Sequence, residues 1–265
     1  MLLVSEIKLL SHHKNLLWQM VSREVKARYK QSVLGYFWVI LNPLAQMLVM
    51  SFAFSLILRI PTAANEKIPY SIFLFTALLP WNLFSNSLSS AANSLVTNSS
   101  LITKVYFPRI ILVLSTIVAK IIDYLFASTI LIAYLAIYKI PISLNILWII
   151  PIFAIQQIFT LGLSLILSAA NLIYRDIQYL LGLVLMLWMY ITPVIYPVDM
   201  VPAQFRFIYQ LNPMSVIINA YRQSILSGSP PKFSSLAIAF FVSFIVLLLG
   251  LRYFKNQEKT FADNV

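Results

Sequence analysis

Long apolar stretches alternate along the chain with short segments that carry most of its charged residues. A helix that crosses a membrane needs roughly 20 mostly apolar residues, and six stretches are candidates for such helices. Their approximate bounds are residues 32–58, 70–91, 110–138, 147–170, 179–196 and 233–251. We therefore predict an all-α membrane protein with six transmembrane helices. The transmembrane domain covers residues 32–252, between an N-terminal segment at residues 1–31 and a tail at residues 253–265.

Two features modify the pattern of the first two stretches. Pro43 lies inside the first stretch and should kink that helix, because proline removes a backbone donor from the helical ladder. The second stretch fades into a Ser/Asn-rich run at residues 85–100. We interpret this run as the end of the helix followed by a loop.

Residues 15–31 have the pattern of an amphipathic helix. Its apolar face carries Trp18, Val21, Val25 and Tyr29. Its polar face carries Arg23, Lys26 and Lys30. A helix of this kind suits the membrane surface. It serves either as a basic membrane anchor alone or as an anchor whose polar face also docks a partner.

The segment between the fifth and sixth stretches is too polar and too rich in proline to span a membrane. Asn212 is a suitable N-cap ahead of Pro213, which suits the first turn of a helix. We predict two short helices, at residues 203–211 and 214–226. They would lie at the outer interface or dip back into the bilayer; the alternative is an ordinary structured loop.

Composition supports a membrane protein. Hydrophobic residues make up 60% of the chain and charged residues 10%, against about 25% charged in soluble domains. The absence of Cys excludes disulfides and thiolate chemistry. The net charge of +11 raises the question of membrane orientation rather than of nucleic-acid binding. With six spans, twelve Lys and Arg lie on the side of the termini and six on the other side, which predicts that both termini are cytoplasmic.

Two charged residues fall inside the third stretch. Lys120 and Asp123 are three residues apart and therefore share a helix face. Because a charge in the bilayer centre is costly, we expect the two to neutralise each other or to face the bundle interior. The alternative is a role in moving substrate or protons.

The sequence offers little enzyme chemistry. There is no G-x-x-x-x-G-K-[ST] loop, so the chain cannot bind ATP in that way. We expect no metal site and no cofactor in this chain, because no carboxylate pair or metal-ligand cluster is visible.

Aromatic residues make up 14% of the chain, and several lie deep in the predicted spans. The candidates for a translocation path are Tyr36, Trp38, Trp188, Tyr190 and Tyr196. They are either packing and interface residues or a surface on which sugar rings stack. Composition does not separate these alternatives.

Several short motifs together carry a family resemblance. They are residues 23–29 (REVKARY), 32–35 (SVLG), 79–81 (LPW), 84–87 (FSNS), 103–109 (TKVYFPR), 171–177 (NLIYRDI), 192–196 (TPVIY) and 211–214 (LNPM). The order of these motifs, and their positions relative to the six spans, give the resemblance. Over about residues 18–253 the chain resembles the ABC-2 type permease subunits of polysaccharide exporters. That group exports O-antigen, capsule and teichoic-acid-type glycans.

The resemblance implies partners and roles that the residues alone do not indicate. The permease would be a homodimer bound to two copies of a separate ABC ATPase, which would hold ATP and Mg. It would export a lipid-linked polysaccharide across the bacterial plasma (inner) membrane. The first and fifth spans of both copies would line the path, and the short helices after the fifth span would gate its outer end.

The resemblance also assigns a set of residues to the cytoplasmic face. The N-terminal amphipathic helix, a short coupling helix within residues 99–108 and the turn at residues 174–177 would lie at or near the ATPase. The residues that would couple to the ATPase are Arg23, Lys26, Arg28, Lys104, Tyr106, Arg109, Arg175 and Asp176.

Three alternatives remain at this stage. The nearest is an ABC-2 permease that exports a drug, a lipid or another small molecule. A membrane-embedded glycan or lipid transferase would need clustered acid, base or metal ligands. A passive channel would need no ATPase. An ATPase gene beside glycan-synthesis genes would favour the polysaccharide exporter.

Overall fold

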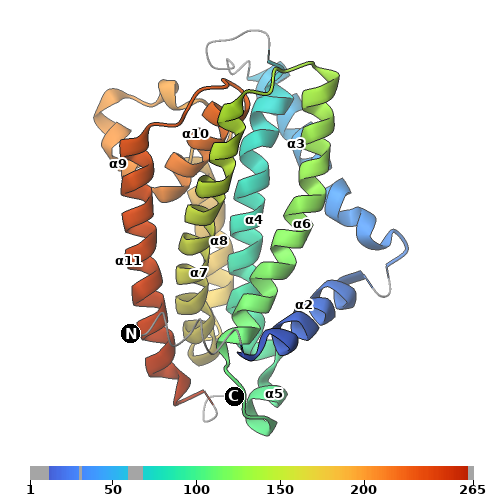
Figure 1. The fold of residues 1–265 in the computed structure, drawn as a ribbon, viewed down its shortest axis with the longest axis vertical. Coiled ribbons are helices and arrows are strands. Elements are labelled where there is room, and N and C mark those ends of the chain that lie inside the picture. The colour runs from blue at the N-terminus through green and yellow to red at the C-terminus, as the bar shows by residue number, and fades with distance from the viewer. Residues whose placement is uncertain (1–11, 30–31, 59–67, 262–265) are drawn as a thin grey trace.

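The computed structural model describes residues 12–29, 32–58 and 68–261. Its long helices stand side by side as a bundle, with α5 at one end and α9 and α10 at the opposite end (Figure 1). The long helices are α4 (Tyr70–Thr97), α6 (Ile110–Ile137), α7 (Ile149–Ile173) and α11 (Phe233–Glu258). The shorter helices are α2 (Lys14–Tyr29), α3 (Trp38–Ser51), α5 (Ser99–Lys104), α8 (Ile177–Ile191), α9 (Arg206–Leu211) and α10 (Pro213–Ile225). The predicted all-α class is confirmed for the described residues.

Within the described part of the chain, four helical segments are long and apolar enough to cross a membrane. They are Gly35–Ile57, Ile110–Ile137, Leu144–Ile173 and Phe233–Glu258. The first joins the 3-10 turn Gly35–Phe37, α3 and the π-helical turn Phe52–Ile57, with Pro43 buried inside α3. Of the six expected stretches, the first, third, fourth and sixth are among these segments. The second, which contains α4, and the fifth, which contains α8, are not.

The run at residues 85–100 does contain the end of the second helix, but the loop predicted to follow it there is reduced to Asn98. α4 continues as a helix to Thr97, and α5 begins at Ser99. The polar side chains do not break the helix because they bond to its own carbonyl oxygens one turn back. Ser89 donates to the carbonyl of Ser85 at 2.9 Å, and Asn93 donates to that of Ser89 at 3.2 Å.

The predicted fifth span, residues 179–196, is also longer than the helix found there. α8 has 15 residues and ends at Ile191. Thr192 is extended, with ψ 139°, because the ring of the following proline disfavours helical backbone at this position. Residues 192–197 therefore lie outside α8.

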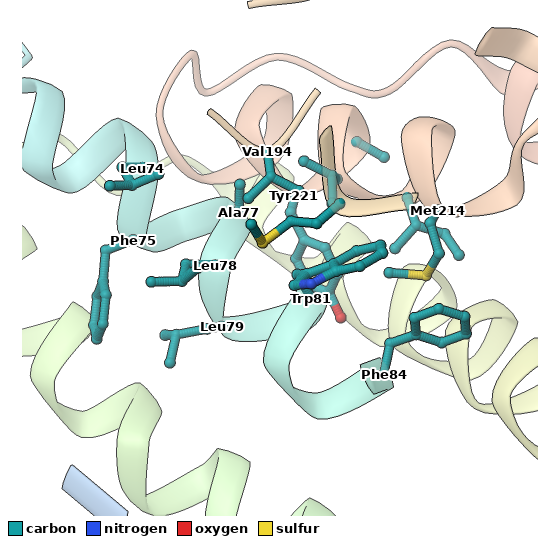
Figure 2. Close-up of a cluster of buried hydrophobic side chains, with 14 of the residues drawn as sticks. Leu74, Phe75, Ala77, Leu78, Leu79, Trp81, Phe84, Val194, Met214 and Tyr221 are labelled. Atoms are coloured by element: carbon teal, nitrogen blue, oxygen red, sulfur yellow. The ribbon is translucent and has the colours of Figure 1, made fainter. Parts of the chain in front are cut away.

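The main apolar core lies between α4, α7, α8 and α10. Figure 2 shows Trp81 and Phe84 of α4 beside Met214 and Tyr221 of α10. All four side chains are at most 3% exposed. Tyr221 also donates to Gln156 Oε1 at 3.3 Å, and Gln156 donates to the carbonyl of Pro80 at 2.8 Å. This chain of contacts fixes α10 against the long helices.

α7 and α11 pack with their backbones almost in contact. Gly162 and Gly250 face each other, and a Cβ at position 250 would lie 2.3 Å from the carbonyl oxygen of Gly162. A Cβ at position 162 would lie 2.6 Å from the backbone nitrogen of Leu247. Only glycine is small enough at these two positions for this approach.

α2 lies obliquely across the lower part of the bundle (Figure 1). Val21 is buried, and Leu16 and Met20 pack against a cluster that includes residues of α6 and α11. Trp18, by contrast, is 63% exposed. Trp18 thus lies outside the buried face of α2, although the sequence pattern had placed it on the same face as Val21.

Candidate functional site

The end of the bundle that carries α5 presents an exposed, basic and aromatic segment. α5 turns away from the end of α4 and is followed by Val105 and Tyr106, which are 54% and 96% exposed. Lys104, the last residue of α5, is exposed as well. A short element with an unburied apolar tip and a cation is suited to docking a partner.

Arg23 connects α2 to the base of α5. Its guanidinium donates to Asn98 Oδ1, and Asn98 is the residue between α4 and α5. Arg23 also lies 3.6 Å from the carboxylate of its neighbour Glu24. The side chain predicted to face a partner therefore ties the amphipathic helix to the exposed segment.

Arg109 connects the start of α6 to the end of α11. Its guanidinium lies 3.9 Å from the carboxylate of Glu258, and its backbone N–H donates to the same carboxylate at 3.4 Å. Arg109 is largely shielded, whereas Lys104 is exposed. Of the two predicted coupling cations in this loop, Lys104 is the more accessible.

The turn between α7 and α8 lies near the lower end of α4. Asn171 donates to the carbonyl of Ala92 at 3.0 Å and accepts from the backbone N–H of Gln178 at 3.0 Å. This anchor leaves Arg175 and Asp176 exposed at the tip of the turn.

The structure thus brings most of the predicted coupling residues to one end of the bundle. Lys26 is exposed on α2, and Arg28 belongs to α2 although its side chain lies outside the described part. Their roles in binding an ATPase stay predictions.

The intramembrane pair lies at the wall of a polar pocket. The Lys120 ammonium is 3.7 Å from the Asp123 carboxylate, and Tyr36 Oη donates to that carboxylate at 3.2 Å. The pocket, about 430 Å³ in volume, is also lined by Trp38. Four amide side chains line it as well: Asn42, Gln46, Asn82 and Asn86. The charges are therefore paired and placed in a polar hollow between α3, α4 and α6.

The predicted aromatic path residues are found in different surroundings. Trp188 packs edge-on against Phe84, with ring centroids 5.3 Å apart, and against Phe159 at 6.1 Å. Tyr190 is 53% exposed, and Trp38 is 40% exposed. As expected for residues two apart on a helix, Trp188 and Tyr190 point in different directions.

Tyr196 caps the open end of α8. Its hydroxyl donates to the carbonyls of Tyr190 at 2.9 Å and Ile191 at 3.1 Å, and it lies 2.6 Å from the hydroxyl of Tyr209. The hydroxyl of Tyr196 therefore contacts both the end of α8 and α9, and these contacts stabilise the structure independently of any role in transport.

Arg222 is a central residue that the sequence analysis missed. It lies on α10 and is 6% exposed. Its guanidinium donates to the carbonyls of Pro193 and Val194, each at 2.6 Å, and stacks 3.6 Å from the ring centre of Phe73. Its partners are distant in sequence. Two features of the sequence could have suggested its role: Arg222 is a basic residue in a mostly apolar helix, and Pro193 interrupts the preceding helix.

In residues 12–29, 32–58 and 68–261, no three His, Cys, Asp or Glu side chains gather as metal ligands. The exposed end with α5 and the polar hollow beside Lys120 are separate features of the described chain.

Known proteins are similar to this chain over nearly its whole length. Residues 15–226 match the ABC-2 type transporter family. The O-antigen export system permease protein RfbA of Klebsiella pneumoniae is 36% identical over 251 residues, which cover 94% of each chain. RfbA of Myxococcus xanthus is 30% identical over 262 residues, or 98% of each chain. The polysialic acid transport protein KpsM of Escherichia coli is 22% identical over 250 residues, or 89% of this chain and 91% of KpsM.

The family match includes every residue predicted to take part in coupling or in the translocation path, from Arg23 to Tyr196. The matches to RfbA of Klebsiella pneumoniae and of Myxococcus xanthus, over 251 and 262 residues, are longer than the family match. The chain therefore belongs to the ABC-2 type transporter family.

Proposed function

We propose that this chain is the permease subunit of an ATP-driven ABC exporter that moves a lipid-linked polysaccharide out across the plasma membrane. The observation that carries this function is the full-length similarity to permeases named for O-antigen and polysialic acid transport. The fold supports it, with apolar helices long enough to cross a bilayer and an exposed segment at one end.

The energy is supplied by a separate ATPase, and the working complex contains two copies of each subunit. The docking surface of the permease consists of α5, Tyr106 and the turn at Arg175 and Asp176. This arrangement is supported by the exposure of these residues at the same end of the bundle. The bond between Arg23 and Asn98 transmits movement of α5 to α2.

The chain crosses the membrane six times, with both termini in the cytoplasm. α4 and α8 then act as spans in addition to the four long apolar segments. α2 lies at the cytoplasmic surface, and α9 and α10 lie at the outer end. The Lys and Arg distribution supports this orientation.

The glycan passes along α3 and α8, and exposed aromatic rings support it there. Tyr190 and Trp38 are the best placed for stacking, because they are more exposed than Trp188. A long polymer must slide through many equivalent positions, so shallow stacking serves better than fixed hydrogen bonds. Leucine at Tyr190 should lower export while leaving complex assembly and basal ATP hydrolysis unchanged; normal export of long glycan by both Tyr190→Leu and Trp38→Leu would contradict the path.

The function is tested by reconstituting the permease with its candidate ABC ATPase and measuring ATP turnover with lipid-linked glycan. The variant Lys104→Glu, Tyr106→Ala should lose glycan-dependent ATP turnover and export, with an unchanged melting temperature, because both side chains are exposed. Lys139→Glu, at the other end of the bundle, is the matched control and should behave like the parent. If a drug or a phospholipid stimulates turnover and lipid-linked glycan does not, the polysaccharide assignment is wrong.

A further inference from the structure

A second polar cavity lies at the end of the bundle opposite α5. It has a volume of about 430 Å³ and lies where one face of α10 meets α9 and the start of α11. Ser215, Asn219, Gln223 and Leu226 recur along this face at helical spacing. The opposite wall includes Tyr209 and Gln210 of α9 and Ser235 of α11. Most of its polar lining can donate hydrogen bonds.

The charges around the cavity are mainly positive. Arg206, Arg222 and Lys232 line it, and Asp199 is the carboxylate among its lining residues. Arg206 and Lys232 are exposed, whereas Arg222 is buried in the wall. None of the ion pairs found in the described chain neutralises these cations. The cavity therefore attracts an anion.

Ser215 gives an independent indication that a ligand belongs there. Its side chain lines the cavity and is 4% exposed, yet its hydroxyl has no hydrogen-bond partner in the described part of the chain. A buried hydroxyl without a partner destabilises the folded state, because it has lost its hydrogen bonds to water. A ligand oxygen that accepts from this hydroxyl would remove that cost.

The cavity lies beside the start of α11, one of the long apolar helices. Lys232 directly precedes α11, one of the long apolar segments, and Ser235 lies in its first turn. The end of a membrane-spanning helix meets the headgroup layer, where phosphate esters are the abundant anions.

We propose that this cavity binds the phosphate ester of a lipid, with Arg206 and Lys232 contacting the phosphate oxygens. Ser215, Asn219 and Gln223 then bond to the remaining oxygen atoms of the headgroup. This chemistry occurs both in an anionic phospholipid headgroup and in the lipid carrier of a glycan. The binding site needs only that α11 crosses the membrane, so it holds for any transported substrate.

The test uses the purified full-length permease in detergent and three soluble probes. Dioctanoyl phosphatidylglycerol represents a bilayer lipid, farnesyl diphosphate represents a prenyl carrier, and dioctanoylglycerol is the phosphate-free control. Microscale thermophoresis should detect saturable binding of at least one phosphate probe, at least tenfold tighter than dioctanoylglycerol. Tighter binding of the first or of the second probe identifies the source of the phosphate, and either result supports the site.

Variants separate this site from general attraction to lipid. Arg206→Gln, Lys232→Gln should weaken phosphate-probe binding at least tenfold, and Lys139→Gln, an exposed cation outside the cavity, should not. Ser215→Ala should weaken binding without lowering the melting temperature, because it removes a hydroxyl that lacks a partner. Equal binding by the parent, the double variant and Ser215→Ala would overturn the proposal, as would equal binding of dioctanoylglycerol.

Discussion

Arg222 joins three separate parts of the chain through one guanidinium. It sits on α10, its hydrogen bonds reach the carbonyls that follow α8, and its stacked ring belongs to Phe73 near the start of α4. The guanidinium can do this because it is planar and rigid and carries several N–H donors that point to different acceptors. The residue thus holds together the end of the bundle at which α9 and α10 lie.

We expect Arg222→Lys to destabilise the protein by about 3 kcal/mol, because one ammonium cannot serve all these acceptors and buried carbonyls would be left without partners. Thermal unfolding in detergent, followed by tryptophan fluorescence, measures the effect. Arg206→Lys is the control, since this exposed side chain makes a single hydrogen bond within the described chain, to the carbonyl of Val201. Equal melting temperatures for the two variants would contradict the role given to Arg222.

The paired charges of α6 lead to a second prediction at this scale. Asp123→Ala removes the carboxylate 3.7 Å from the Lys120 ammonium and should reduce folded yield strongly, at a cost of about 3–5 kcal/mol. The triple change Tyr36→Phe, Lys120→Met, Asp123→Leu should recover much of that yield, because the two charges and the hydroxyl that contacts Asp123 are removed together. Gel-filtration yield provides the measurement. A triple variant that folds well but cannot export, while Tyr36→Phe alone exports normally, would assign the pair to transport.

At the scale of elements, the sequence predicted helices better than it predicted their ends. Hydrophobicity located α6 and the start of α11 almost to the residue, because charged or prolyl residues bound those stretches. It ended α4 too early, since Ser and Asn were taken as breakers although they bond within the helix. It ended α8 too late, since apolar character continues beyond the break at Pro193.

The contact between α7 and α11 depends on side-chain size at one crossing point. Gly250→Ala should destabilise the protein by about 1–3 kcal/mol, because its Cβ would meet the carbonyl oxygen of Gly162 and the helices would have to separate. Gly182→Ala on α8 is the matched control, as nothing lies within 4 Å of its new Cβ. There alanine should be neutral or stabilise the helix by up to about 1 kcal/mol. Thermal melts of both variants measure the difference in stability. An unchanged melting temperature for Gly250→Ala would rule out the close packing.

At the scale of the whole molecule, the candidate sites were predictable only in part. The clustering of Lys104, Tyr106 and Arg175 at one end followed from the order of the spans, because alternate loops share a side. The partners of Arg23 and Arg109 did not follow, since Asn98 and Glu258 are brought near by packing. The phosphate cavity also depends on packing, because α9, α10 and α11 each supply only part of its lining.

The proposed orientation predicts the location of reporter fusions. Fusions after Thr103 and after Gln257 should report the cytoplasm, and fusions after Lys139 and Ser229 should report the outside, because Lys and Arg favour the cytoplasmic loops. Alkaline phosphatase and green fluorescent protein fusions give opposite signals and check each other. A cytoplasmic signal at Ser229 would exclude the six-span arrangement.

The shortness of α8 alters the barrier that a polar molecule meets beside it. Fifteen helical residues extend over about 22 Å, whereas the hydrocarbon layer is about 30 Å thick. If α8 crosses the membrane as proposed, the difference falls on residues 192–196, whose backbone is not helical and whose carbonyls at Pro193, Val194 and Tyr196 accept from Arg222. Backbone dipoles of these residues then take the place of lipid tails over that depth, or the bilayer becomes thinner to match the length of α8. A hydrated polymer moving alongside α8 would cross a thinner low-dielectric layer than one moving alongside α6 or α11.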